Sequence, residues 1–133
     1  MRSSSANRWR DLGGAFSAAV VMCRVAIGLR LMSFPVLLDR LRLRETMEWA
    51  EPECIAQAQT DVRRAHRLLP LAPNCLLDSL TAATLIRRKG YSVPLAIGVR
   101  SEQGEVLAHA WLGREGACGA EGFRLLYRVP NED

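Results

Sequence analysis

The pattern of apolar residues changes at Gly90, and this change limits the folds that are open to the chain. Before Gly90, apolar residues recur every three or four positions, which is typical of helices. After Gly90, short runs alternate in the manner of strands. The chain has 133 residues, the size of one ordinary domain. We therefore expect a single domain over residues 1–133 of the α+β class, with N-terminal helices followed by a small antiparallel sheet.

Four helical segments are expected before Gly90. In the first, residues 15–32, one face carries the apolar side chains, with Arg24 beside it. These side chains are Phe16, Val20, Cys23, Ile27 and Leu31. Ser33-Phe34-Pro35 predicts a break, because proline disfavours helix in the residue before it. A short helix over residues 36–43 follows, and then helices over residues 50–69 and 75–89.

The residues after Gly90 predict strands. Residues 93–100 and 105–112 form a hairpin around a turn at 101–104. A short strand over 118–123 and another over 124–129 extend the sheet.

Charge and composition exclude several classes of protein. The net charge of +4 comes mostly from arginines before residue 45, which suggests an acidic partner or a membrane surface. Nucleic acid is less favoured, because the arginines are interleaved with apolar stretches and form no contiguous polar stripe that carries stacking aromatics. Arg24, Arg30 and Pro35 interrupt the most apolar stretch, 13–38, so we expect no membrane-spanning segment. No phosphate-binding loop is present, so the chain itself should hydrolyse no nucleotide.

The cysteines point to a reducing compartment. The spacing of Cys23, Cys54, Cys75 and Cys118 contains no C-x-x-C, and the N-terminus has no secretory cleavage site. We therefore expect a cytoplasmic protein. The cysteines and the two histidines also lack zinc-ligand spacing, so we expect neither a metal nor a cofactor.

A cysteine that opens a helix and a histidine on a later strand carry the predicted chemistry. Cys75 follows Asn74, a preferred N-cap, so its thiol lies at the positive end of a helix, which favours the thiolate and offers N–H groups to an oxyanion. His109 lies in the second strand of the hairpin. A cysteine and a histidine within hydrogen-bond reach form a nucleophile and its base.

The residues around this pair resemble one family. The segments Asn74-Cys75-Leu76-Leu77-Asp78-Ser79-Leu80, Arg87-Arg88-Lys89-Gly90-Tyr91, Leu95-Ala96-Ile97-Gly98-Val99 and Ala108-His109-Ala110-Trp111-Leu112 are similar to the leader-peptide-cleaving protease of lasso-peptide biosynthesis. The resemblance covers residues 70–128. It implies a papain-like, transglutaminase-core cysteine protease fold, with Cys75 as nucleophile and His109 as base.

The resemblance also implies a third catalytic residue and a set of partners. Glu121 stands where the family has an aspartate that orients the histidine, with Glu115 and Asp78 as alternatives, and Trp111 is a candidate wall of the substrate site. The partners implied are the precursor's leader peptide, a separate leader-binding protein and an ATP-dependent lasso cyclase. Residues 1–49 would dock a partner or the peptide, and residues 50–133 would form the protease core.

Two other functions remain open. A transglutaminase-like acyl transferase would use the same thioester and pass it to an amine. A non-enzymatic adaptor would use the basic, apolar helices for binding, with Cys75 and His109 in structural roles. Cys23 and Cys54 are expected to be structural, Cys118 to lie in a strand, and His66 to lie on a solvated helix face.

Overall fold

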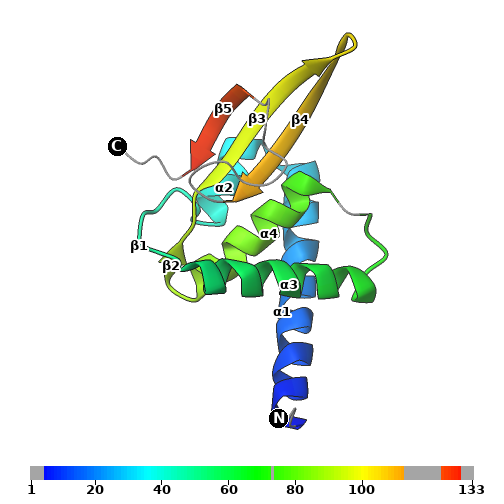
Figure 1. The fold of residues 1–133 in the computed structure, drawn as a ribbon, viewed down its shortest axis with the longest axis vertical. Coiled ribbons are helices and arrows are strands. Elements are labelled where there is room, and N and C mark those ends of the chain that lie inside the picture. The colour runs from blue at the N-terminus through cyan, green and yellow to red at the C-terminus, as the bar shows by residue number, and fades with distance from the viewer. Residues whose placement is uncertain (1–4, 73, 113–123, 130–133) are drawn as a thin grey trace.

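A computed structural model describes residues 5–72, 74–112 and 124–129 of the chain. The described residues form helices at one end and a small sheet at the other, so the fold is α+β as predicted (Figure 1). The helices are α1 (Ser5–Leu31), α2 (Phe34–Arg40), α3 (Pro52–Leu68) and α4 (Cys75–Arg88). The strands are β1 (Glu48–Trp49), β2 (Tyr91–Ser92), β3 (Leu95–Glu102), β4 (Glu105–Leu112) and β5 (Arg124–Val129).

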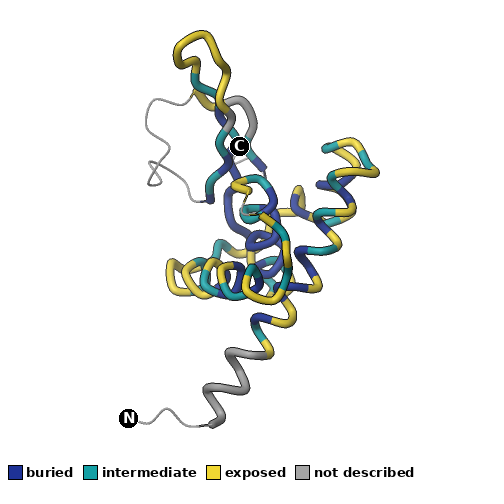
Figure 2. Tube along the Cα trace, turned by 90° about the vertical axis from the view of Figure 1, so that its right-hand side faces the viewer, coloured by how far each residue is buried: buried dark blue, intermediate teal, exposed yellow. Residues whose placement is uncertain are grey.

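Helix α1 packs with the face opposite to the one that the periodicity indicated. Its contacts with α3 and α4 bury mainly small side chains, and Met22 and Val25 are fully buried among them. The predicted stripe faces outward instead, with Phe16 66% and Leu31 77% exposed, as the exposed colour along α1 shows (Figure 2). The prediction failed because both sides of this helix are apolar, so periodicity did not identify the packed side.

The segment Gly13–Leu31 of α1 is long and apolar enough to cross a membrane by length and composition, and 39% of it is buried inside the protein. It contains both Arg24 and Arg30, so the expectation that these arginines exclude such a segment was too strict. The buried part belongs to the hydrophobic core, which includes residues from α1 through β5.

Helix α2 begins earlier than predicted. Ser33 has extended backbone angles and is its N-cap, and Pro35 lies in its first turn. The predicted break between the two helices was confirmed at Ser33. It does not extend to Phe34 and Pro35, because the first turn of a helix needs no N–H from the proline. Pro52 has the same position in α3, where the prediction was confirmed.

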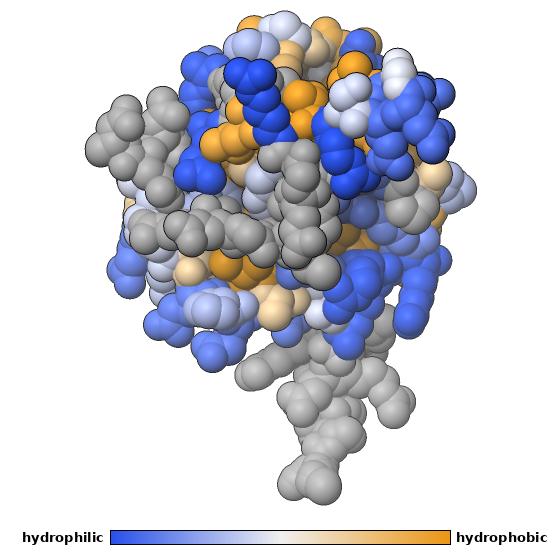
Figure 3. Space-filling view, turned by 45° about the horizontal axis from the view of Figure 1, so that its top comes forward, coloured by the Kyte–Doolittle hydropathy of each residue, from blue (hydrophilic) through white to orange (hydrophobic). Residues whose placement is uncertain are grey.

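Strands β3 and β4 form the predicted hairpin, and its two-residue turn is Gln103-Gly104. Both turn residues have positive φ, 52° and 83°, which matches the twist of a tight hairpin. Strand β5 pairs antiparallel with the other side of β3, so the order is β4-β3-β5. Figure 3 shows the face of the molecule at the sheet end. On this face, hydrophobic residues are interspersed with hydrophilic ones and form no single large patch.

A second, parallel pair joins β1 to β2 beyond the end of α4. Gly90 has a φ of 94° and lets the chain turn from α4 into β2, as its predicted role as a helix stop requires. The side chain of Ser92 then receives a hydrogen bond from the Met47 N–H. This pairing links the α2–α3 connection to the start of the sheet region.

Candidate active site

Cys75 is the first residue of α4, as predicted, and its side chain is exposed. Asn74 is the N-cap: its Oδ1 accepts hydrogen bonds from the backbone N–H groups of Leu76 and Leu77, at 2.9 and 3.1 Å. Asparagine at this position satisfies donors that the helix itself leaves unpaired. The cap therefore fixes the backbone that carries the thiol.

The same cap changes the predicted oxyanion site. Because Asn74 accepts from Leu76 and Leu77, those two N–H groups are occupied. Within the described parts of the chain, the Cys75 N–H has no bonded acceptor. The donor that this helix end offers to an oxyanion is thus the backbone N–H of Cys75 itself.

His109 lies near the middle of β4 and its ring stacks on Trp111. The two ring centroids are 5.8 Å apart and the planes differ by 21°, which confirms that Trp111 and His109 share one face of the strand. Gly98 of β3 lies directly opposite His109. A Cβ on Gly98 would come within 3.0 Å of the Trp111 ring and 2.9 Å of the Arg124 carbonyl oxygen. The absence of a side chain at Gly98 therefore makes the room that Trp111 occupies.

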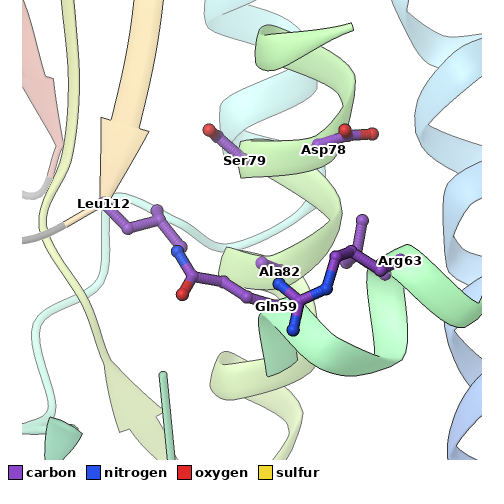
Figure 4. A pocket seen from close by; sticks show the side chains of 7 residues that line it. Gln59, Arg63, Asp78, Ser79, Ala82 and Leu112 are labelled. Carbon is purple, nitrogen blue, oxygen red and sulfur yellow. The ribbon is translucent and has the colours of Figure 1, made fainter. Parts of the chain in front are cut away.

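A hydrogen bond links α4 to the strand that carries His109. The Ser79 hydroxyl donates to the carbonyl oxygen of Ala110, the residue next to His109, at 3.3 Å. Ser79 lies four residues after Cys75 and hence on the same side of α4. Figure 1 shows the N-terminal end of α4 beside β4, and Figure 4 shows Ser79 pointing toward that strand. The structure thus places Cys75 on α4 and His109 on β4. The hydrogen bond between Ser79 and Ala110 joins these two elements close to both residues.

His66 was predicted to lie on a solvated helix face, and this prediction was wrong. The side chain connects α3 to α4 instead. Its Nε2 lies 2.7 Å from Asp78 Oδ1, and its Nδ1 lies 3.1 Å from the Leu71 carbonyl oxygen. Its side chain is only 15% exposed. The Leu71 carbonyl can only accept a hydrogen bond, and the same holds for an ionised carboxylate. An imidazolium has two N–H groups and can make both bonds, whereas a neutral ring has one N–H group and can make one. Asp78, an alternative for orienting His109, is paired with the other histidine.

A cavity of about 270 Å³ lies beside these groups (Figure 4). Asp78, Ser79 and Ala82 form its α4 wall, while α3 and the end of β4 form the remainder. Arg63 on α3 lines it as well, with one guanidinium nitrogen donating to the Thr60 hydroxyl. The cavity begins about one turn after Cys75, at Asp78 and Ser79.

Several predicted site residues lie outside the described residues, namely Glu115, Cys118 and Glu121. The predicted strand over 118–123 lies there too. Cys23 and Cys54 are half-buried free thiols. Among the described residues no three His, Cys, Asp or Glu side chains form a group that could hold a metal ion.

Three residues of the site were missed in the sequence: His66, Ser79 and Gly98. Ser79 could have been found from its four-residue spacing to Cys75. Gly98 could have been found as a glycine inside a strand, which often marks a close approach of another group. The partners of His66 depend on how α3 packs on α4, and no local pattern indicates that.

The comparisons with known proteins agree with this geometry. A family model described as the transglutaminase-like superfamily matches residues 19–128, which include α4, β3, β4 and the second half of α1. No curated protein and no solved structure matches the chain. The superfamily supports an activity of the cysteine-protease or acyltransferase type in general terms. The family model covers most of the chain, and the structure has an exposed cysteine at the start of a helix and a histidine on an adjoining strand. This chain therefore belongs to the transglutaminase-like superfamily.

Proposed function

We propose that this protein is a cysteine peptidase that removes the leader from a ribosomally made lasso-peptide precursor. The observation that carries the proposal is the capped, exposed Cys75 on a helix that Ser79 bonds to β4, beside His109. The resemblance of the segments around Cys75 and His109 to lasso-peptide leader peptidases supplies the substrate class. Membership of the transglutaminase-like superfamily is consistent with the thioester chemistry.

In this proposal Cys75 and His109 share one proton-transfer cycle. The Cys75 thiolate attacks the carbonyl carbon at the end of the leader, and the oxyanion is held by the Cys75 N–H. His109, as imidazolium, gives its proton to the departing amine of the core peptide, which leaves a thioester on Cys75. His109 then removes a proton from water, the hydroxide attacks the thioester, and the leader leaves as a carboxylate. Glu121 would orient His109.

The neighbouring residues have supporting roles in the proposal. Trp111 stacks on His109 and would limit the positions that the imidazole adopts. The cavity lined by Asp78, Ser79 and Ala82 would accept substrate side chains next to the scissile bond. The cavity wall carries one basic and one acidic side chain, Arg63 and Asp78, beside apolar ones, which suits an extended peptide with mixed side chains.

We further propose that the peptidase works in the cytoplasm with a separate leader-binding protein and an ATP-dependent lasso cyclase. Residues 1–49 would dock a partner or the peptide, and residues 50–133 would carry the catalysis. Both parts contribute to one hydrophobic core, so the docking region would be rigidly attached to the catalytic region.

The experiment is a cleavage assay on precursor peptides encoded beside this protein, with and without the neighbouring leader-binding protein. Product masses are measured for the wild type, Cys75→Ala and Cys54→Ala, where Cys54 is the matched control thiol near a helix start. One cut that needs Cys75 but not Cys54 supports the peptidase. A product in which the acyl group is joined to an added amine supports the acyl transferase instead. No product with any peptide supports the adaptor.

A further inference from the structure

A cleft on the far side of α4 from Cys75 is lined by arginines from three segments. It has a volume of about 390 Å³. The five arginines are Arg24 of α1, Arg40 of α2, Arg42 of the turn after α2, and Arg87 and Arg88 of α4. Its other lining residues are uncharged, so no carboxylate forms part of the wall. We refer to this feature as the arginine cleft.

Most of the positive charge in the arginine cleft is uncompensated. Arg87 is held in place, because it donates to the Arg42 carbonyl oxygen at 3.2 Å and to Glu45 at 2.6 Å. Arg42 also pairs with Glu45, at 4.0 Å, so one carboxylate serves two of the five arginines. Arg24, Arg40 and Arg88 have no ion-pair partner within the part of the chain that the structure describes. A cavity that gathers several cations without counter-charges attracts anions.

Helix dipoles do not account for the whole cluster. Arg40 lies in the last turn of α2, and Arg87 and Arg88 lie in the last turn of α4, where cations are favourable in any protein. Arg24 lies in the middle of α1, where the dipole has no such effect. Its place in the wall therefore calls for another explanation.

Arg24 also borders the exposed apolar side of α1. The residues Phe16, Val20, Ile27 and Leu31, which we call the outer stripe, are all exposed. At 3.6 residues per turn, Arg24 lies at one edge of the outer stripe and Arg30 at the other. The chain has no acidic residue from Leu12 to Leu38, so α1 places no negative charge beside the outer stripe in this range.

We propose that the outer stripe and the arginine cleft together bind the surface of an anionic phospholipid membrane. Guanidinium groups bind phosphate through paired hydrogen bonds, and the cleft would take a lipid headgroup. The outer stripe is a convex row on one helix, flanked by arginines, and it would lie in the interface with its side chains among the acyl chains. A soluble phosphate as the ligand would account for the arginine cleft, but it would leave the apolar side chains of the outer stripe exposed to water.

The protein lies on the membrane in this arrangement and does not cross it. Crossing would surround α1 with lipid, yet the opposite side of α1 is packed against α3 and α4. The candidate segment Gly13–Leu31 thus has two apolar sides, which Arg24 and Arg30 separate in part: one side belongs to the core, and the other would face the bilayer.

The test is co-sedimentation of the full chain with vesicles of phosphatidylcholine alone or with roughly one third phosphatidylglycerol. The wild type should bind the anionic vesicles only, and high salt should release it. Arg24→Gln with Arg88→Gln should lower the partition coefficient about thirtyfold, at roughly fivefold per arginine. Phe16→Ser should lower it about tenfold through lost apolar contact. Arg67→Gln, which removes one positive charge on α3 away from the cleft, should leave it unchanged.

The substituted side chains are exposed, so folding should be preserved, and the circular dichroism of each variant checks this. Three results would overturn the proposal. The first is equal or no binding to both vesicle types. The second is binding of inorganic pyrophosphate that depends on Arg24, without vesicle binding, which would assign the cleft to a soluble phosphate. The third is a dimer in solution that Phe16→Ser abolishes, without vesicle binding, which would assign the outer stripe to a second copy.

Discussion

The imidazole of His66 lies 2.7 Å from the carboxylate of Asp78, so the last turn of α3 is bonded to the first turn of α4. The other ring nitrogen is bonded to the Leu71 carbonyl, in the connection between these helices. This one side chain therefore fixes the chain on both sides of Asn74 and Cys75. If Cys75 is the nucleophile, as proposed, His66 would be a positioning residue for the thiol, since it would act through the helix that carries it.

Replacing His66 should weaken both the fold and the site. His66→Ala removes the side chain that lies between Asp78 and the Leu71 carbonyl and leaves Asp78 without its partner, so the free energy of unfolding should fall by about 1–2 kcal/mol. The alkylation rate of Cys75 should change as well, because the turn that carries the thiol is less constrained. Urea unfolding and alkylation kinetics measure the two effects. Arg67→Ala, at the adjacent exposed position, is the control, and equal behaviour of both variants would contradict this role for His66.

The N-cap of α4 predicts a separate effect on stability. Asn74→Ala removes the acceptor for the N–H groups of Leu76 and Leu77 and should cost about 1 kcal/mol. Asn74→Asp keeps an acceptor at the helix N-terminus and should retain most of the stability. Thermal unfolding of the two variants tests this. If alanine is as stable as aspartate at this position, the cap is not a source of stability.

The contact between Gly98 and Trp111 predicts a cost for the smallest possible side chain. Gly98→Ala brings a methyl group within 3.0 Å of the Trp111 ring and 2.9 Å of a backbone oxygen, which cannot move as readily as a side chain. The free energy of unfolding should fall by about 1–3 kcal/mol. Since Trp111 stacks on His109, the cleavage rate should fall too.

Gly13→Ala is the matched control for this change. Nothing lies within 4 Å of a Cβ at Gly13, which is in α1, so alanine should be neutral or should stabilise the helix by up to about 1 kcal/mol. Equal effects of the two substitutions on stability and cleavage would show that the room at Gly98 is not needed.

The sequence was sufficient to predict the elements whose determinants are local. The helix start at Cys75, the asparagine cap, the glycine stop at Gly90 and the hairpin of β3 and β4 were confirmed, because each depends on residues within a few positions. The pairing of β1 with β2 was not predicted. It joins residues more than forty positions apart, and two-residue strands carry no periodicity.

The packed side of α1 and the partner of His66 could not be predicted for a related reason. Small residues let α1 approach α3 and α4 closely, while larger apolar residues stayed outside, so hydrophobicity alone selected the wrong side. His66 stands among three arginines and reads as exposed, but the packing of α3 on α4 places Asp78 beside it. Both errors concern tertiary contacts and leave the secondary structure unchanged.

The central claim is that Cys75 and His109 act as nucleophile and base. The most direct measurement is the rate at which iodoacetamide alkylates each cysteine at neutral pH, read by mass spectrometry, in the wild type and in His109→Gln. Cys75 should react at least about tenfold faster than Cys23 and Cys54, and His109→Gln should remove most of that difference. A Cys75 that reacts like an ordinary exposed thiol, with no effect of His109→Gln, would contradict the claim.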